Sequence, residues 1–80
     1  MIDKATHGIV RAKSVTPSNT VDLGETTRAI YVGVAGDISC EMVGGGTQVF
    51  VGLAAGMFHP IQCNRVNATG TTAASIVAGF

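Results

Sequence analysis

Apolar side chains alternate with small or polar ones through the middle of this sequence, and that spacing limits what the chain can fold into. From residue 30 to residue 42 the apolar positions recur at every second residue on either side of a short break: Ile30, Val32, Val34, Ile38, Cys40 and Met42. Successive side chains of a β-strand point to opposite faces of its sheet, so a period of two is typical of strands buried on one face. No segment combines a 3.6-residue apolar repeat with helix-capping residues. The sequence therefore predicts an all-β fold.

Glycine-rich segments separate the predicted strands. Gly36-Asp37 is predicted to form a tight turn between two antiparallel strands. Gly44-Gly45-Gly46 is a second break, because glycine adopts positive φ without a steric cost. Strand-forming residues follow at positions 48–53, and Ala54-Ala55-Gly56 predicts another turn.

The last third of the chain repeats this pattern. Pro60 precedes a weakly alternating segment, residues 61–67, and the start of a strand is where its missing N–H is best tolerated. Residues 68–72 predict a turn, and residues 74–78 a final strand. With one short strand within residues 9–15, we expect a small antiparallel β-sandwich or barrel of about six short strands.

The first 27 residues differ from the rest of the chain. They contain both lysines, Pro17 and a polar stretch, residues 16–20, that predicts a turn or an extended loop. We expect residues 1–27 to form an extended N-terminal arm and loop, and residues 28–80 to form a compact β domain. No hydrophobic run of signal-peptide type occurs near the N-terminus, so we expect a soluble chain made in the cytoplasm.

Charged residues are too few to cover the surface of an isolated domain. Five basic and five acidic residues make up 12% of the chain, whereas about a quarter is usual. We therefore expect copies of the chain to cover part of one another. The basic residues are scattered and the net charge is zero, which argues against binding of nucleic acid. The longest apolar stretch, residues 49–58, is half the length that a membrane-spanning helix needs.

The residue types that carry chemistry do not form a recognisable site. Cys40 and Cys63 lack metal-ligand spacing and are most simply two buried, reduced thiols, although a single disulfide stays open. Residues 32–37 are glycine-rich after a strand but do not open a helix, as a nucleotide-binding loop must. His7 and His59 have no nucleophile or carboxylate in a recognisable set, and the acidic residues form no cluster. We therefore predict no catalytic, cofactor-binding or metal-binding residue.

Bulky side chains are rare in this chain, so those that face outward are candidates for contacts between subunits. Tyr31 lies on the opposite face of its strand from Ile30, Val32 and Val34, and it faces outward if those three face the core. Tyrosine and arginine are enriched among the residues that dominate binding energy at interfaces. The residues that we predict at a subunit interface are Arg28, Tyr31, Phe58 and Arg65.

Several segments together resemble a known family. They are Thr-Pro-Ser-Asn-Thr at residues 16–20, Thr-Arg-Ala-Ile-Tyr-Val-Gly-Val-Ala-Gly-Asp-Ile at residues 27–38, Arg-Val-Asn-Ala-Thr-Gly-Thr-Thr-Ala at residues 65–73 and Ile-Val-Ala at residues 76–78. From about Thr16 to its end the chain resembles the spike base proteins of tailed phages and of phage-derived gene transfer agents.

The resemblance implies a non-enzymatic structural protein of a virion. Its expected role is to assemble with copies of itself on the head surface as the base for a spike or fibre, or to act as a capsid decoration subunit. The expected partners are copies of itself and capsid and spike or fibre proteins, and the chain would be made in the cytoplasm of a bacterial host. The number of subunits stays open.

Two other functions also stay open from the sequence. One is a carbohydrate- or receptor-binding β module of a fibre, which requires exposed aromatic platforms. The other is a small enzyme or nucleotide-binding protein, which requires a pocket where polar groups converge.

Overall fold

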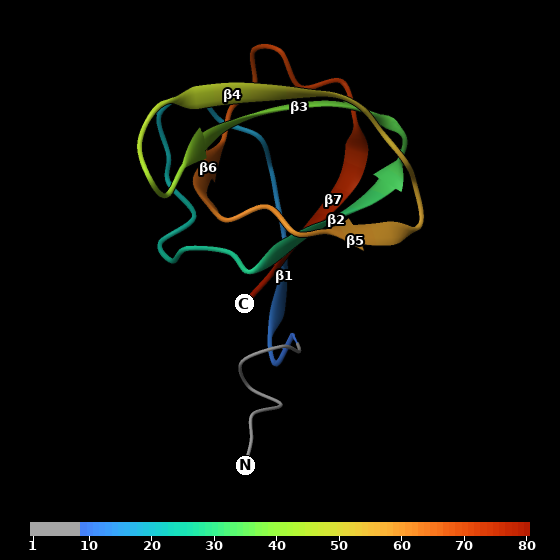
Figure 1. The fold of residues 1–80 in the computed structure, drawn as a ribbon, viewed down its shortest axis with the longest axis horizontal. Coiled ribbons are helices and arrows are strands. Elements are labelled where there is room, and N and C mark those ends of the chain that lie inside the picture. The colour runs from blue at the N-terminus through green and yellow to red at the C-terminus, as the bar shows by residue number, and fades with distance from the viewer. Residues whose placement is uncertain (1–8) are drawn as a thin grey trace.

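A computed structural model describes residues 9–80, and predictions that fall on His7 and the other N-terminal residues lie outside this range. Within this range seven strands form two antiparallel sheets (Figure 1). The strands are β1 (Ala12–Ser14), β2 (Ala29–Val34), β3 (Gly36–Met42), β4 (Thr47–Leu53), β5 (Met57–His59), β6 (Cys63–Val66) and β7 (Ala74–Gly79). The predicted all-β architecture is confirmed.

One sheet has four strands in the order β1-β7-β2-β5, and the other has three in the order β4-β3-β6. A single apolar core lies between them and is formed by Ile30, Val32, Ile38, Cys40, Ile61, Cys63, Val66, Ala73, Ile76, Ala78 and Phe80. The alternation in β2 fits this arrangement, because Ile30 and Val32 are fully buried while Tyr31 between them is partly exposed. The two facing sheets make a small β-sandwich.

The predicted turn at Gly36-Asp37 is wrong. Only Ala35 separates β2 from β3, and these two strands belong to different sheets, so the chain crosses from one sheet to the other instead of folding back as a hairpin. Gly36 permits the crossing, because a Cβ atom there would lie 2.6 Å from the backbone nitrogen of Ala73. Asp37 then joins neighbouring segments, since its backbone N–H donates to Thr72 Oγ1 and its carboxylate accepts from the N–H of Gly52.

The break at residues 44–46 is confirmed as the turn between β3 and β4. Gly45 and Gly46 have φ values of 100° and 88°, which β-carbon sterics disfavour in other residues. The turn is closed by backbone hydrogen bonds from Gly45 to Met42 and from Met42 to Gly46. Strand β5 was not predicted, because only three residues separate the turn at Gly56 from Pro60.

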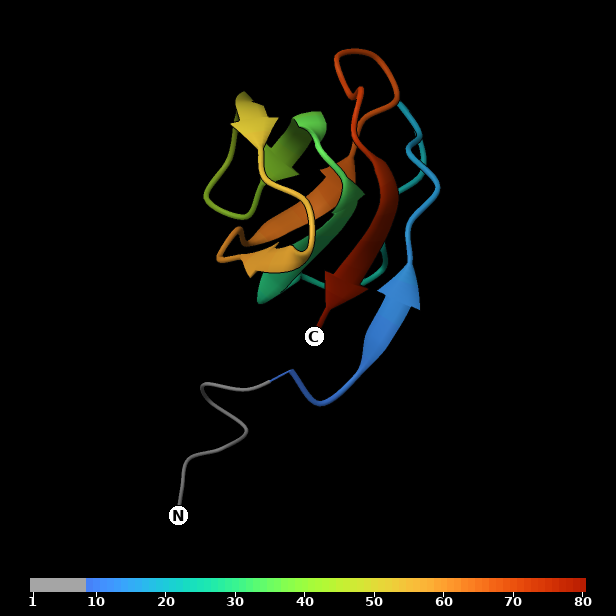
Figure 2. The ribbon, with the colours of Figure 1, turned by 90° about the vertical axis from the view of Figure 1, so that its right-hand side faces the viewer.

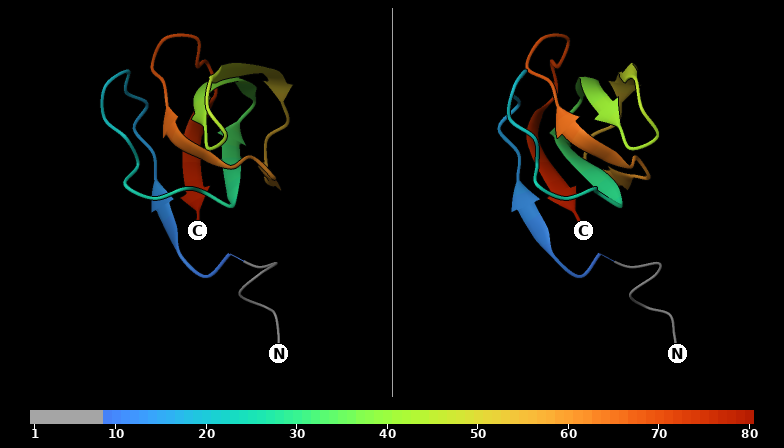
Figure 3. Two further views of the ribbon diagram at one scale, coloured as in Figure 1. Left: turned by 60° about the vertical axis from the view of Figure 1, so that its left-hand side comes forward. Right: turned by 90° about the vertical axis from the view of Figure 1, so that its left-hand side faces the viewer.

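Residues 9–27 pass from one sheet to the other (Figures 2 and 3). Strand β1 pairs with β7, and later backbone N–H groups donate to the free edge of β6. These later bonds run from Ser18 to Val66, from Leu23 to Asn64 and from Thr27 to Cys63. The division of the chain at residue 28 into an arm and a body stays a prediction. Among the residues that the structure describes, no helix is long and apolar enough to cross a membrane.

The close approach at Gly36 generates a test of the crossing between the sheets. We expect Gly36→Ala to lower the free energy of unfolding by about 2 kcal/mol, because the new methyl group meets backbone that cannot move without strain. Gly44→Ala is the matched control, since no atom lies within 4 Å of a Cβ there and its φ is not positive. Urea unfolding of both variants measures the difference, and equal stabilities would contradict the crossing as described.

Candidate subunit-interaction surface

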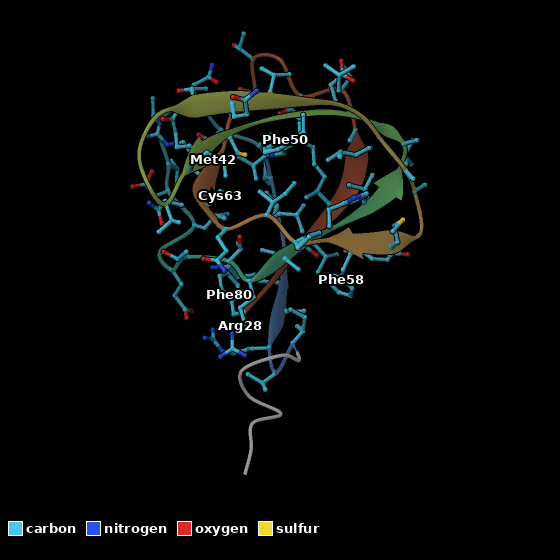
Figure 4. All side chains as sticks on the ribbon, in the orientation of Figure 1. Arg28, Met42, Phe50, Phe58, Cys63 and Phe80 are labelled. Carbon is cyan, nitrogen blue, oxygen red and sulfur yellow. The ribbon has the colours of Figure 1, made fainter. Side chains whose placement is uncertain are left out.

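Tyr31 and Phe58, two of the four predicted interface residues, are in contact. They are register partners on β2 and β5, and their ring centroids lie 5.3 Å apart at an interplanar angle of 60°, an edge-to-face arrangement. Phe58 is 43% exposed. In Figure 4, Phe50 points into the space between the sheets, whereas Phe58 points away from it. The pair therefore lies on the outer face of the four-stranded sheet.

The rest of this outer face is small and uncharged. The register of the sheet places on it Ala12, Ser14, Ala29, Gly33, Ser75, Val77 and Gly79. Ile9 covers Gly79, because a Cβ atom on this glycine would lie 2.6 Å from Ile9 Cδ1. Small side chains beside one aromatic pair leave a flat surface with no ionised group to desolvate, which favours contact with another protein.

Arg65 lies on the other side of the molecule. It pairs with Glu41 across β3 and β6, on the outer face of the three-stranded sheet. Its Nε donates to Asp22 Oδ1 at 2.8 Å, and its terminal nitrogen donates to the carbonyl oxygen of Asn19, also at 2.8 Å. The structure therefore does not bring Arg65 together with Tyr31 and Phe58, and it uses this arginine to hold residues 19–22 on β6.

Arg28 is exposed and comes directly before β2. Its backbone N–H donates to the carbonyl oxygen of Gly79 at 2.7 Å, which places it at the end of the four-stranded sheet. Arg11 lies at the same end, 5.1 Å above the ring of the buried Phe80, and binds Glu25 through two hydrogen bonds. These bonds hold the pKa of Glu25 below its usual value. The assignment of all four residues to a subunit interface stays a prediction.

Charged side chains are distributed unevenly over the fold. Within residues 9–80, five of the eight charged residues lie on residues 9–28, and Arg65 lies beside that segment on β6. The other two, Asp37 and Glu41, lie on β3 and accept hydrogen bonds from Gly52 and Thr47 of β4. Residues 43–58, which include β4 and most of β5, contain no ionisable side chain. Val34, Val51 and Met57 are exposed in this half of the molecule.

The two cysteines are free and fully buried. Cys63 lies beside Thr27, whose hydroxyl is 3.7 Å from the sulfur. The hydrogen bond between the two thiols, together with burial, raises the pKa of Cys40 well above its ordinary value. The Cys40 thiol is therefore a poor nucleophile, and full burial makes both cysteines small core residues.

Other groups with catalytic potential are already engaged. His59 Nε2 lies 2.9 Å from the carbonyl oxygen of Ala54. An open depression beside residues 22–26 contains the carboxylates of Asp22 and Glu25, and each of them is paired with an arginine. Within residues 9–80 no three metal-ligating side chains come together.

The buried thiols generate a second test. We expect the native protein, purified without reductant, to react negligibly with a disulfide reagent such as Ellman's, because neither sulfur is reachable and Cys40 stays protonated. After unfolding in guanidinium chloride, both thiols of each chain should react. No reactive thiol after unfolding would mean that the two cysteines are bonded to each other.

Comparisons with known proteins place the chain in a family. No family model matches the sequence, and no curated protein does. A solved structure does match: a chain described as "Capsid of native GTA particle computed with C5 symmetry", where GTA denotes a gene transfer agent. The two chains are 32% identical, the match covers 100% of each, and their folds superimpose with a TM-score of 0.78. This protein therefore belongs to the same family as that component of a gene transfer agent capsid.

Proposed function

We propose that this chain is a non-enzymatic structural protein of a phage-like particle, and that it forms a homo-oligomeric base for a spike or fibre on the head surface. The observation that carries the proposal is the 32% identity, over the full length of both chains, to a component of a gene transfer agent capsid. The segments that resemble spike base proteins, residues 16–20, 27–38, 65–73 and 76–78, support the finer assignment.

The distribution of charge supports assembly with further copies. Residues 43–58 contain no ionised side chain, while three valines and Met57 are exposed in this segment. Solvent-facing surfaces of isolated domains usually carry both signs of charge at high density. A surface without charge loses little on desolvation, so covering it with a neighbour is favourable.

A ring is the arrangement that we propose for these copies. The similar particle was computed with C5 symmetry, and subunits around such an axis contact each other through two different surfaces. The outer face of the four-stranded sheet, with Tyr31 and Phe58, is one of these surfaces. Arg28 borders this face. Arg65 lies on the other sheet, where it holds residues 19–22 against β6. Capsid and spike or fibre proteins are the partners above and below the ring, and the chain is made in the bacterial host cytoplasm.

The proposed assembly predicts the mass of the purified protein. We expect the chain to run as a homo-oligomer of fixed size in light scattering at micromolar concentration, because the uncharged surface of residues 43–58 is buried only in the assembly. A map of intact particles should then place several copies around a symmetry axis on the head. A stable monomer that is also absent from particles would refute the proposal.

The contact between Tyr31 and Phe58 predicts a position at which a substitution weakens the assembly. We expect Phe58→Glu to weaken the association by about 30-fold, or roughly 2 kcal/mol, since it puts a charge into the aromatic pair of the contact face. Val21→Glu is the control, because this valine is 65% exposed and lies on residues 9–27. Sedimentation equilibrium measures both dissociation constants, and equal values would remove Tyr31 and Phe58 from the interface.

A further inference from the structure

The outer edge of β4 is not paired with another strand in residues 9–80. The strand has seven residues and pairs with β3 on one side. Within residues 9–80 no strand pairs with its other edge, because β4 is the terminal strand of its sheet. Alternate N–H and C=O groups of an edge strand point away from the sheet, so β4 presents backbone groups that no strand pairs with. Side chains bond two backbone groups of β4, the carbonyl of Val49 and the N–H of Gly52.

The other sheet edges of this protein are protected. Residues 18–27 bind the edge of β6 through three backbone hydrogen bonds, and β1 covers β7. Strands β1 and β5 are edges themselves, but each has only three residues. Lys13 lies within β1, and Pro60 directly follows β5. Covering segments, short length, lysine and proline are the devices by which proteins keep edge strands from pairing with other chains.

Strand β4 has none of these devices over most of its length. It contains no charged residue and no proline. Val49 and Val51 are 41% and 77% exposed. The backbone of β4 is irregular only near its end, where Gly52 has a positive φ and the pairing with β3 shifts register. A strand of this kind is a template for a further strand, because pairing satisfies its backbone groups and covers the valines together.

We propose that the open edge of β4 pairs with the backbone of a second copy of this chain, extending the three-stranded sheet across the subunit boundary. This inference rests on the homo-oligomer of the proposed function. The occupant is a second copy because residues 43–58 carry no charge that would attract a charged partner, and the same chain offers uncharged, apolar surface to match it. In a ring the β4 edge is the second of the two contacting surfaces, beside the outer face of the four-stranded sheet.

A matched pair of substitutions tests the pairing. We expect Val51→Lys to weaken self-association by at least about tenfold, because lysine on an edge strand disfavours pairing with another chain. Val21→Lys is the control, since Val21 has a similar exposure and lies on residues 9–27. Both variants should keep the circular dichroism and the unfolding midpoint of the unmodified protein, because both positions are exposed. Sedimentation equilibrium gives the dissociation constants.

Hydrogen exchange of the unmodified protein gives a second readout that needs no variant. In the oligomer, the amides of residues 47–51 should be protected at successive positions, whereas in the diluted, dissociated chain alternate positions should exchange at least about tenfold faster. Contact between side chains alone would not protect the alternate amides whose N–H groups point away from β3.

Two outcomes would overturn the inference, and they are distinct from failure of the proposed function. An oligomer whose dissociation constant is unchanged by Val51→Lys, or whose alternate β4 amides exchange rapidly when assembled, would exclude edge pairing while leaving the homo-oligomer intact. Either result would instead indicate that the edge of β4 stays unpaired in the oligomer or meets a different protein of the particle. A chain that is monomeric at every concentration would refute both the edge pairing and the homo-oligomer.

Discussion

The segment from residue 9 to residue 27 is bonded to both sheets, and the rest of the structure depends on this closure. It pairs with β7 through β1 and then donates three N–H groups to β6. Thr27 ends the segment inside the core, where its hydroxyl donates to the carbonyl of Ile61 and accepts from the N–H of Cys63. Two buried backbone groups thereby find partners, which matters because an unpaired buried group costs about 1–3 kcal/mol. A chain of 80 residues has little reserve against such losses.

The same segment determines where the protein can meet others. Most of the described charged side chains lie on it or contact it, because Arg11 pairs with Glu25 and Arg65 pairs with Asp22. These pairs are exposed, so they add little to stability, but they keep that side of the sandwich hydrated. The opposite side is then left with valines, alanines and glycines. One segment thus closes the core and concentrates the charge, and in the assembly that we propose both effects leave residues 43–58 as the surface for contacts.

Local spacing predicted much of the fold, and contacts between distant residues account for what it missed. The alternation at residues 30–34 predicted β2 and the outward direction of Tyr31. It gave the wrong partner for β2, because a strand that crosses to the opposite sheet alternates in the same way as one that folds back in a hairpin. Arg65 stood out only as a bulky residue, because its partner Asp22 lies 43 positions earlier in the chain. The contact of Tyr31 with Phe58 required β5, whose three residues carry too little pattern to predict.

The edge of β4 is left uncovered because the segment that covers the other edges lies on one side of the sandwich. Residues 9–27 are long enough to cover the edges of β7 and β6, but these edges lie on one side of the sandwich, so the edge of β4 on the other side stays uncovered. A larger domain covers such an edge with a further element of its own chain, whereas residues 9–80 place no strand on it. In the ring that we propose, a neighbouring copy supplies the missing cover at no cost in chain length. The absence of charge from residues 43–58 removes the repulsion that would otherwise oppose this contact.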